Sequence, residues 1–372
     1  MKKSLYIHIP FCQSRCTYCD FYTTIYKRTM AVSFLSVLVK QIKKLDCNFE
    51  TIYIGGGTPT VLDIDLIEKL LKELEKIAGE AKEFTIEANP ESLDEDKIRL
   101  FSDYSVNRIS IGCQSFSDQK LNFLGRIHSA EQALDSVEKV KRRGFDNISI
   151  DLIYGLPSES YKLWQKDLVK ARELPVTHLS AYMLTYEKGS CLYKRFEAGE
   201  FLPLASDKIA QMYKQLIGQL EEKEFFQYEI SNFSKKKFKS IHNFRYWENK
   251  PYIGLGPSAA SFFAGKRQRN ISCLPEYIKA VRKNEKIWEY SEKLSSFQAA
   301  KEAAALKIRT REGISFSWFK QKTGFDFQEL EKDSLPKLFE QGLIKQTKNG
   351  KEAIKLTKKG LLFADSVSAA LL

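Results

Sequence analysis

The sequence is poor in cysteine and contains no long hydrophobic run. Seven cysteines in 372 residues, with no secretory leader before them, are too few to indicate a disulfide framework. No segment approaches the roughly 20 consecutive apolar residues of a membrane-spanning helix. The start Met1-Lys-Lys leads directly into a patterned strand and not into a cleavable leader. We therefore expect a cytoplasmic protein, with peripheral association as its only contact with membranes.

The sequence also has fewer acidic than basic residues. It contains 59 Lys and Arg and 47 Asp and Glu, which gives a net charge of +12. A nucleic-acid partner is one interpretation of this excess. Along most predicted helices, however, the basic residues are interspersed with acids, which favours a solvated basic surface. The hydrophobic content of 43% is typical of a globular protein. The length allows two or three domains with a large core.

Three of the few cysteines lie together, directly after an apolar strand near the start of the chain. Cys12, Cys16 and Cys19 have the spacing Cys-x-x-x-Cys-x-x-Cys, which lets one loop direct three sulfurs at a common centre. A structural zinc site normally has four N or S ligands, so zinc would need His8 or a distant residue as well. An iron-sulfur cluster held by three thiolates keeps one iron open for a small molecule. Inert buried thiols explain the clustering poorly.

The run Tyr6-x-His8-x-Pro-Phe-Cys12-x-x-x-Cys16-x-Tyr18-Cys19 resembles the signature of radical S-adenosylmethionine (SAM) proteins of the HemN/HemW family. In that family the three cysteines hold a 4Fe-4S cluster, and SAM chelates its fourth iron. The resemblance implies that one electron from the cluster cleaves SAM to a 5′-deoxyadenosyl radical. It also implies an electron donor such as flavodoxin or ferredoxin.

After the cysteine loop, strands and helices alternate. Strands are predicted at 51–54, 83–90, 108–114, 147–155 and 178–183, and helices at 30–45, 63–78, 93–101, 130–143 and 161–173. Six strand-helix repeats predict an α/β fold, a partial (β/α)6 TIM-like barrel over residues 1–186. Ligands should gather at the carboxyl ends of its strands.

Polar residues recur at those strand ends. The third strand carries Glu87 near its end, and the fourth ends at Gln114. The fifth strand contains Asp151, and Thr185 follows the sixth. The glycines 55–57 follow the second strand. A single such residue is ordinarily a helix cap, and a glycine run is ordinarily a turn. Repetition on consecutive strands favours a binding site at one mouth.

The resemblance to the HemN/HemW family implies ligand-binding roles for these residues. The SAM pattern of the family matches Tyr6, Gly56, Gly57, Thr58, Glu87, Gln114, Arg126, Asp151 and Thr185. Some members hold a second SAM, and Tyr18, Gly57, Thr58, Gln114, Arg126 and Asp151 match that second site. Arg126 can hold a carboxylate in a charge-assisted pair, or it can form a salt bridge on the barrel rim. The isolated Cys47, Cys113, Cys191 and Cys273 are expected to be small buried hydrophobes.

A second motif, His242-Asn-x-x-Tyr246-Trp247, lies in residues 187–293, an extension of the barrel that begins with a loop-rich stretch and continues with a helix predicted at 206–224. Its residue types suit a flat aromatic ligand: His242 as an axial ligand to haem iron, the two aromatics as stacking faces, and Arg245 as a propionate partner. A packed cluster is the ordinary alternative. The run resembles a motif typical of HemW-type proteins, which implies haem binding.

Residues 294–372 form a separate α+β module. Helices are predicted at 294–306, 317–323 and 326–341, followed by two β-runs joined by Asn349-Gly350, a hairpin signal. This pattern indicates a winged-helix-like domain. Winged helices often bind DNA, but the corresponding domain of the family covers the open end of the barrel. We therefore expect no specific nucleic-acid partner.

Two functions compete within the family. One is oxygen-independent coproporphyrinogen III dehydrogenase, which oxidatively decarboxylates propionate chains. The other is a haem chaperone, which hands haem to an acceptor protein, possibly a respiratory one. The dehydrogenases typically carry one more cysteine two residues after the motif and a long N-terminal segment. This chain has Phe21 at that position and eleven residues before Cys12. These departures favour the chaperone, and they leave open whether the chain is an enzyme.

Overall fold

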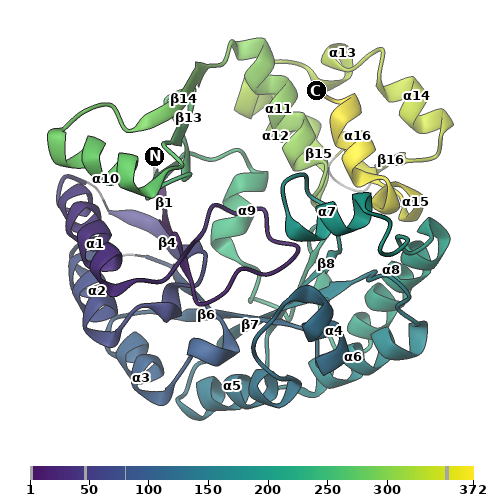
Figure 1. The fold of residues 1–372 in the computed structure, drawn as a ribbon. Helices are drawn as coiled ribbons and strands as arrows, with labels where there is room; N and C mark the ends of the chain where they lie inside the picture. Colours follow the sequence, from purple (N-terminus) through teal and green to yellow (C-terminus); the bar gives the residue numbers. More distant parts are fainter. Residues whose placement is uncertain (1–2, 46–47, 80, 348–351) are drawn as a thin grey trace.

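The computed structural model describes residues 3–45, 48–79, 81–347 and 352–372. Six parallel strands curve around the centre of the molecule with helices outside them (Figure 1). In spatial order they are β1 (Lys3–Ile9), β4 (Phe49–Gly56), β5 (Glu83–Ala88), β6 (Arg108–Gln114), β7 (Asn147–Tyr154) and β8 (His178–Met183). The expected partial (β/α)6 barrel is confirmed. Among the described residues no strand pairing closes the sheet.

Helices pack on the outside of the sheet. They are α1 (Arg28–Ile42), α2 (Ile64–Ala78), α3 (Glu95–Asp103), α4 (Asp118–Leu124), α5 (Ala130–Arg142) and α6 (Tyr161–Glu173). Three of them, α3, α5 and α6, begin at residues whose side chains cap the helix. In α2, Leu66, Leu70 and Leu74 repeat every four residues and are buried in the core. Ser129 caps α5 with a complete capping box, which explains why that boundary was readable from the sequence.

The inner face of the barrel is polar. Because side chains alternate across a strand, the apolar residues of β5 and β6, such as Phe84 and Ile109, pack outward under the helices. The strand register places the polar residues between them on the opposite face, and they include Ser4, Tyr6, Thr51, Tyr53, Glu83, Glu87, Arg108, Ser149, Asp151, His178 and Ser180. The interior of a TIM barrel is usually filled by branched apolar side chains. Here it carries hydrogen-bonding groups instead.

Residues 187–293 extend the barrel sheet at both edges. The elements are α7 (Cys191–Glu197), α8 (Ser206–Glu221), β9 (Phe226–Gln227), β10 (Asn232–Ser234), α9 (Ile241–Trp247), β11 (Tyr252–Leu255), β12 (Ala260–Phe263), β13 (Lys266–Asn270), α10 (Leu274–Lys283) and β14 (Trp288–Lys293). β10 pairs with β8, and β11 pairs with β1. The segment before α8 is loop-rich apart from α7, as expected, and the helix predicted at 206–224 corresponds to α8. Strands such as β13 were not predicted, because their charged residues lack an apolar alternation.

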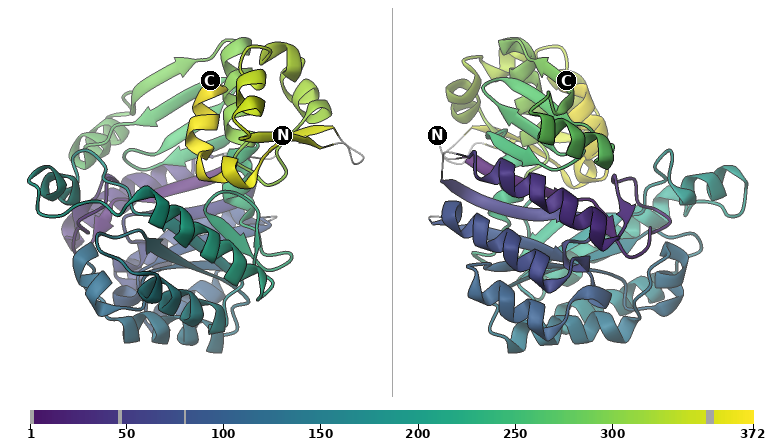
Figure 2. Two further views of the ribbon diagram at one scale, coloured as in Figure 1. Left: turned by 90° about the vertical axis from the view of Figure 1, so that its right-hand side faces the viewer. Right: turned by 60° about the vertical axis from the view of Figure 1, so that its left-hand side comes forward.

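The C-terminal module lies over one side of the barrel (Figure 2). It contains α11 (Ser296–Lys307), β15 (Ile314–Ser315), α12 (Phe316–Thr323), α13 (Phe327–Leu330), α14 (Leu335–Glu340), β16 (Ile344–Thr347), β17 (Ala353–Leu356), α15 (Lys358–Leu362) and α16 (Ala364–Ala370). The predicted helix at 326–341 is two helices, since Pro336 occupies the first turn of α14 and cannot continue a helix from upstream. The Asn349-Gly350 turn lies outside the described residues.

The module is joined to the barrel extension by backbone hydrogen bonds. Arg311 N donates to Tyr228 O at 2.9 Å, and Glu229 forms an isolated bridge with Thr310. Within the described residues, no helix has both the length and the apolar character needed to cross a membrane.

Candidate functional site

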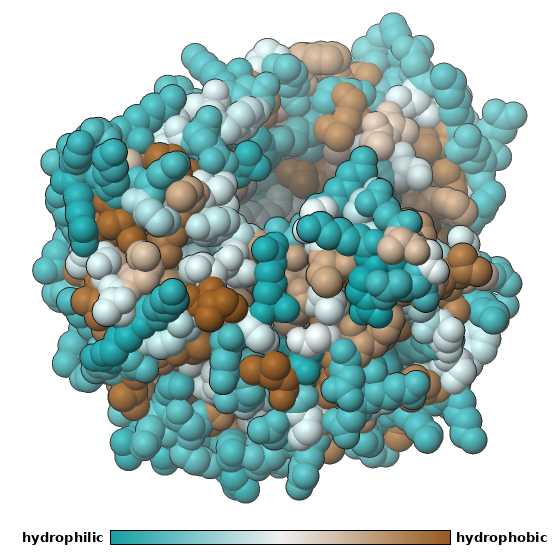
Figure 3. Space-filling view, viewed as in Figure 1, coloured by the Kyte–Doolittle hydropathy of each residue, from teal (hydrophilic) through white to brown (hydrophobic). Residues whose placement is uncertain are grey.

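A cavity of about 830 Å³ opens at the carboxyl ends of the barrel strands. Figure 3 shows this face hollowed near its centre, with hydrophobic side chains inside the hollow. Of the predicted site residues, those in its lining are Cys12, Cys16, Tyr18, Cys19, Gly56, Gly57, Thr58, Glu87, Gln114, Arg126, Asp151 and Thr185. Tyr6 and His242 are outside it. The fold therefore brings nearly the whole predicted set together.

The cysteine loop is fixed against two neighbouring segments. Thr58 N donates to Phe11 O at 2.7 Å, and Thr17 N donates to Leu124 O at the end of α4 at 3.0 Å. A Cβ atom on Gly57 would lie 2.5 Å from Phe11 O, so only glycine allows the glycine loop to approach this closely. The positions of the three thiols are thus set by contacts distant in sequence.

Each of two thiols has a polar neighbour. Thr58 Oγ1 donates to Cys12 Sγ at 3.6 Å, and Arg126 Nη1 donates to Cys16 Sγ at 3.3 Å. Burial raises the pKa of Cys12 and raises that of Cys19 to about 11. Iron binding must therefore displace protons from these thiols.

The donor set suits a cluster better than a single ion. Among the described residues, no three His, Cys, Asp or Glu side chains are grouped so that they could hold one metal ion. A tetrahedral zinc ion needs its ligand atoms crowded at about 2.3 Å from the metal. Three thiols in one loop, beside an open cavity and a cationic Arg126, fit a cluster of several irons.

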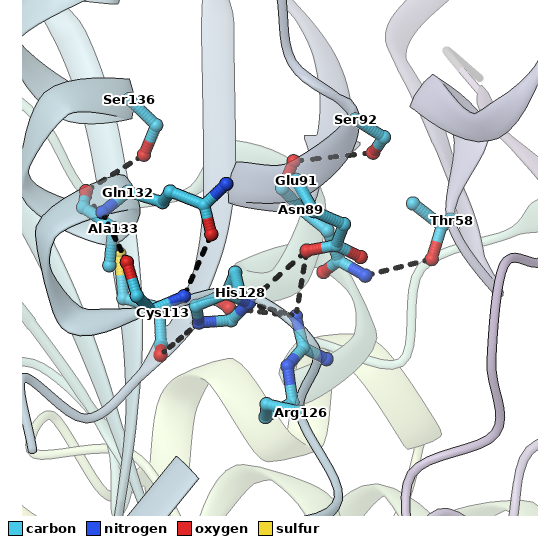
Figure 4. A network of polar contacts seen from close by, with 12 residues as sticks. Thr58, Asn89, Glu91, Ser92, Cys113, Arg126, His128, Gln132, Ala133 and Ser136 are labelled. Carbon is cyan, nitrogen blue, oxygen red and sulfur yellow. Dashed lines mark hydrogen bonds and ion pairs between the residues drawn. The ribbon is translucent and has the colours of Figure 1, made fainter. Parts of the chain in front are cut away.

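Arg126 belongs to a buried polar network that the sequence analysis did not foresee (Figure 4). Its Nη2 donates to Gly112 O at 3.0 Å and lies 4.0 Å from Glu91 Oε2. His128 Nδ1 is 3.1 Å from the same carboxylate oxygen, and His128 Nε2 donates to Cys113 O at 3.1 Å. Burial would raise the pKa of Glu91, but the His128 hydrogen bond and the Arg126 charge outweigh it and lower the pKa.

Asn89 completes this network on the other side. Its Nδ2 donates to Thr58 Oγ1 at 2.9 Å, so Cys12 and Cys16 are both connected to the segment that follows β5. Asn89 and Glu91 could have been predicted, because Asn89 lies near the end of the strand predicted at 83–90 and Glu91 follows it. The rule that selected Glu87 would have selected them too.

Glu87 connects the barrel interior to the glycine loop. Tyr53 donates its hydroxyl hydrogen to Glu87 Oε1 at 2.6 Å, and Gly56 N donates to Oε2 at 3.1 Å. Burial raises the pKa of Glu87 to about 7, with a further contribution from the Asp151 charge. Near neutral pH this carboxyl group can therefore gain or lose its charge when a ligand arrives.

A buried charge cluster shapes the ends of β6 and β7. Lys120 Nζ lies 2.5 Å from Glu159 Oε1 and 2.8 Å from Asp167 Oδ2. Asp167 accepts a hydrogen bond from Phe116 N, and Glu159 accepts one from Gly155 N. These bonds hold the loops next to Gln114 and Ile153. No local sequence signal pointed to this cluster, because its three members lie on separate elements.

The structure does not bring His242 to the cavity. Its side chain is buried, with Nδ1 2.8 Å from Thr51 Oγ1 and Nε2 2.8 Å from the Tyr246 hydroxyl. Burial, with the charges of Arg245 and Arg108, lowers its pKa to about 3. Arg245, the expected propionate partner, is buried and paired with Glu50. Helix α9 thus forms the packed cluster considered as the ordinary alternative.

Tyr6 lies in the barrel interior beside this cluster. Its hydroxyl is 3.1 Å from His8 Nδ1, and its ring contacts that of Tyr53. It supports the residues under the cavity without lining it.

The isolated cysteines differ in how far they are buried. Cys113 is buried, as expected, whereas Cys191 is exposed at the start of α7, a helix that projects from the body of the molecule (Figure 2). Expecting a buried Cys191 was wrong, because the first residue of a projecting helix has few neighbours. Cys273 is half-buried, and Cys47 lies outside the described residues.

Apolar side chains form another part of the cavity lining, which we call the apolar compartment. Large hydrophobic side chains line it while remaining 42–61% exposed, which is unusual for such residues. They are Phe21, Ile127, Tyr182, Met183 and Phe363. Phe363 belongs to the C-terminal module, so this compartment is shared between the barrel and that module.

Comparison with known proteins agrees with this geometry. The radical SAM superfamily model matches residues 6–168, and the HemN C-terminal domain model matches residues 294–363. A protein named haem chaperone HemW from Lactococcus lactis is 35% identical over 98% of this chain and 96% of its own length. Another protein of that name, from Bacillus subtilis, is 32% identical over 100% of this chain and 99% of its own length.

One solved structure shares the fold over the whole chain. Coproporphyrinogen III oxidase (HemN) from Escherichia coli, described as a radical SAM enzyme, superposes with a TM-score of 0.86. The superposition covers 100% of this chain and 90% of the HemN chain, and the two sequences are 21% identical. That likeness concerns the fold alone.

Proposed function

Because the chain belongs to the radical SAM superfamily, and within it to the HemN/HemW family, we propose that it is a haem chaperone that binds a 4Fe-4S cluster, SAM and haem. Membership of the superfamily implies the cluster and SAM. The observation that carries the haem proposal is the shared cavity, in which the three thiols adjoin an apolar compartment large enough for a second ligand. Relatives named as haem chaperones, similar over nearly the full chain, support it.

The residues of the cavity divide between two ligands in this proposal. Cys12, Cys16 and Cys19 hold the cluster, which supplies one electron to SAM when both are bound. The cationic Arg126 suits a carboxylate of SAM. The carboxyl group of Glu87, already holding the glycine loop, suits an amino or ribose hydroxyl group. Tyr18, Gln114, Asp151 and Thr185 complete the lining around them.

For haem, the apolar compartment is favoured over helix α9. Ligation by His242 would require Nε2 to give up the Tyr246 hydroxyl and the ring to leave a packed interior. The compartment beside Phe21 and Phe363 already presents apolar surface to a ligand. His242 is therefore proposed to support the barrel interior.

The alternative function is coproporphyrinogen III dehydrogenase. The cavity could admit that substrate too, but Phe21 stands where the dehydrogenases typically carry a further cysteine, and its side chain lines the apolar compartment. This difference favours a carrier. As a carrier, the protein needs a haem-acceptor protein, possibly respiratory, and an electron donor such as flavodoxin or ferredoxin. A cytoplasmic location with no specific nucleic-acid partner is part of the same proposal.

The test combines a haem titration with an activity assay. Protein with a reconstituted cluster is titrated anaerobically with haem, followed by absorbance. The same preparation is incubated with SAM, a reductant and coproporphyrinogen III. We expect saturable haem binding and no protoporphyrinogen. Protoporphyrinogen formation would establish the dehydrogenase instead, and absence of saturable haem binding would remove the chaperone.

A variant series decides the position of haem. His242→Ala is expected to retain haem affinity within about threefold, because the side chain does not reach the cavity. A large loss of haem affinity, with cluster content and thermal stability unchanged, would restore helix α9 as the haem site.

A further inference from the structure

Arg309, two residues after α11, is a cationic residue of the cavity lining contributed by the C-terminal module. It lines the cavity together with Phe363 and Asp365 of the C-terminal module. Its Nη1 forms an ion pair with Asp365, a carboxylate that is 88% exposed. Its Nε is buried and has no hydrogen-bond partner among the described residues. The Arg309 side chain itself is 21% exposed, so its guanidinium is only partly desolvated and can meet an acceptor in the cavity that it lines.

The surroundings of Arg309 favour a ligand anion over a permanent partner. Glu229 lies close enough to be influenced by the Arg309 charge, but it accepts hydrogen bonds from Asn232 and Ser231, and burial raises its pKa. Asp365 is hydrated in its free form and gains little from the pair. A carboxylate brought into the cavity by an apolar ligand would be less hydrated there and would bind Arg309 more strongly.

Helix α9 holds this guanidinium in place. The Arg309 Cζ atom lies 5.4 Å from the centre of the Trp247 ring, in cation–π geometry. Trp247 is the last residue of the His-Asn-x-x-Tyr-Trp run. The motif therefore reaches the cavity through Arg309, even though His242 does not.

On these contacts we propose that Arg309 binds a propionate of haem in the compartment formed by Tyr182, Met183 and Phe363, and that this propionate replaces Asp365. Trp247 is a positioning residue for Arg309. The inference rests on the proposed haem-chaperone function and adds the residues that recognise the ligand. The ligand class is a planar apolar molecule that carries at least one carboxylate.

The test compares haem with haem dimethyl ester, whose propionates carry no charge. Both are titrated into full-length, cluster-loaded wild-type protein and the variants Arg309→Gln and Asp365→Asn. Arg311→Gln is the matched control, because Arg311 is exposed two residues away and is outside the cavity lining. Circular dichroism melting checks that each variant is folded.

Arg309→Gln is expected to weaken binding of haem about tenfold or more, with binding of the ester changed less than twofold. Asp365→Asn is expected to strengthen haem binding two- to fivefold, because the competing carboxylate is gone. Arg311→Gln should match wild type. A general loss of structure would weaken haem binding in both variants, so opposite effects of Arg309→Gln and Asp365→Asn cannot arise from it. If Arg309→Gln fails to fold, Asp365→Asn alone still tests whether the Asp365 carboxylate competes with haem.

Trp247→Leu tests the positioning role through a double-mutant cycle. It should weaken haem binding by two- to fivefold in wild type and have no further effect when combined with Arg309→Gln. Equal losses in both backgrounds would show that Trp247 does not act through Arg309.

The results separate the two levels of proposal. If wild type binds neither haem nor its ester, the haem-chaperone function fails. Two outcomes would show that the assignment of Arg309 is wrong while the haem-chaperone function stands. In the first, wild type binds haem, and both Arg309→Gln and Asp365→Asn bind it with the same affinity. In the second, Arg309→Gln lowers the affinity for haem and for the ester equally.

Discussion

We expect Glu87 to couple the binding of SAM to pH. Its pKa is raised from 4.5 to about 7 by burial, so the folded protein holds this proton over a range in which the unfolded chain has released it. Between about pH 4.5 and 7 the group therefore lowers stability as pH rises. Above about pH 7 it is a carboxylate next to Gly56 N, and it can then attract the ammonium group of SAM.

We therefore expect SAM affinity to rise from pH 6 to pH 8. Glu87→Gln should match wild type near pH 6 and bind SAM about tenfold more weakly at pH 8, where a hydrogen bond to a charged group is lost. Equilibrium dialysis of cluster-loaded protein measures both. A wild-type affinity that is flat across this range, or a Glu87→Gln variant with the same slope, would contradict the role of Glu87.

Single residues were predictable from the sequence where their position carried a signal. Glu87, Gln114 and Asp151 lie near the carboxyl ends of consecutive strands, and the parallel sheet places them at one mouth. Arg309 and Lys120 gave no such signal. Their positions depend on how helices pack against the barrel, and that packing joins residues far apart in the sequence.

At the scale of elements, the Lys120 cluster decides the shape of the cavity. It joins α4 to α6 and to the turn after β7, with all three charged side chains at most 2% exposed. A buried charge left without its partner is costly. Removing Lys120 would leave Glu159 and Asp167 as two buried carboxylates side by side.

Lys120→Met is expected to lower the free energy of unfolding by about 3–5 kcal/mol. Lys166→Met is the control, because Lys166 is an exposed lysine of α6, next to Asp167 in the sequence, and should change stability by less than about 0.5 kcal/mol. Urea denaturation followed by circular dichroism measures both. A loss below about 1 kcal/mol for Lys120→Met would show that the two carboxylates are relieved by protonation or by solvent.

The elements of residues 1–186 and helix α8 followed from the sequence, whereas the strands of residues 187–293 did not. Helix α6 and strands β6 and β8 lie where they were predicted, since apolar residues repeat with a clear period. Strand β13, Lys266–Asn270, is made of charged and polar residues, and it is a strand because β12 and β14 pair with it on both sides. Tertiary pairing overrides local propensity there.

At the scale of the molecule, the cavity joins the barrel to the C-terminal module. Tyr182 and Met183 come from the end of β8, whereas Phe363 comes from the junction of α15 and α16. A ligand held between them contacts both parts at once. Its binding must stabilise both against local opening.

Haem at 100 times its dissociation constant should therefore stabilise the protein by about 2.7 kcal/mol. Hydrogen exchange should slow at the end of β8 and in α15–α16 together, as followed by mass spectrometry. SAM alone should slow exchange in the cysteine and glycine loops and leave α15–α16 unchanged. Protection by haem that is confined to α9 would place the haem elsewhere.

The open sheet gives this cavity a freedom that closed barrels lack. A closed barrel has a diameter fixed by its strand number and stagger, whereas here the described strands leave an edge at β9 and another at β14. The two edges can separate slightly without breaking any strand pairing. The C-terminal module bridges the two edges, through Tyr228 and Glu229 beside β9 and through the ion pair between Arg267 of β13 and Glu302 of α11. Entry and release of a rigid macrocycle would therefore require this module to shift together with the sheet edges.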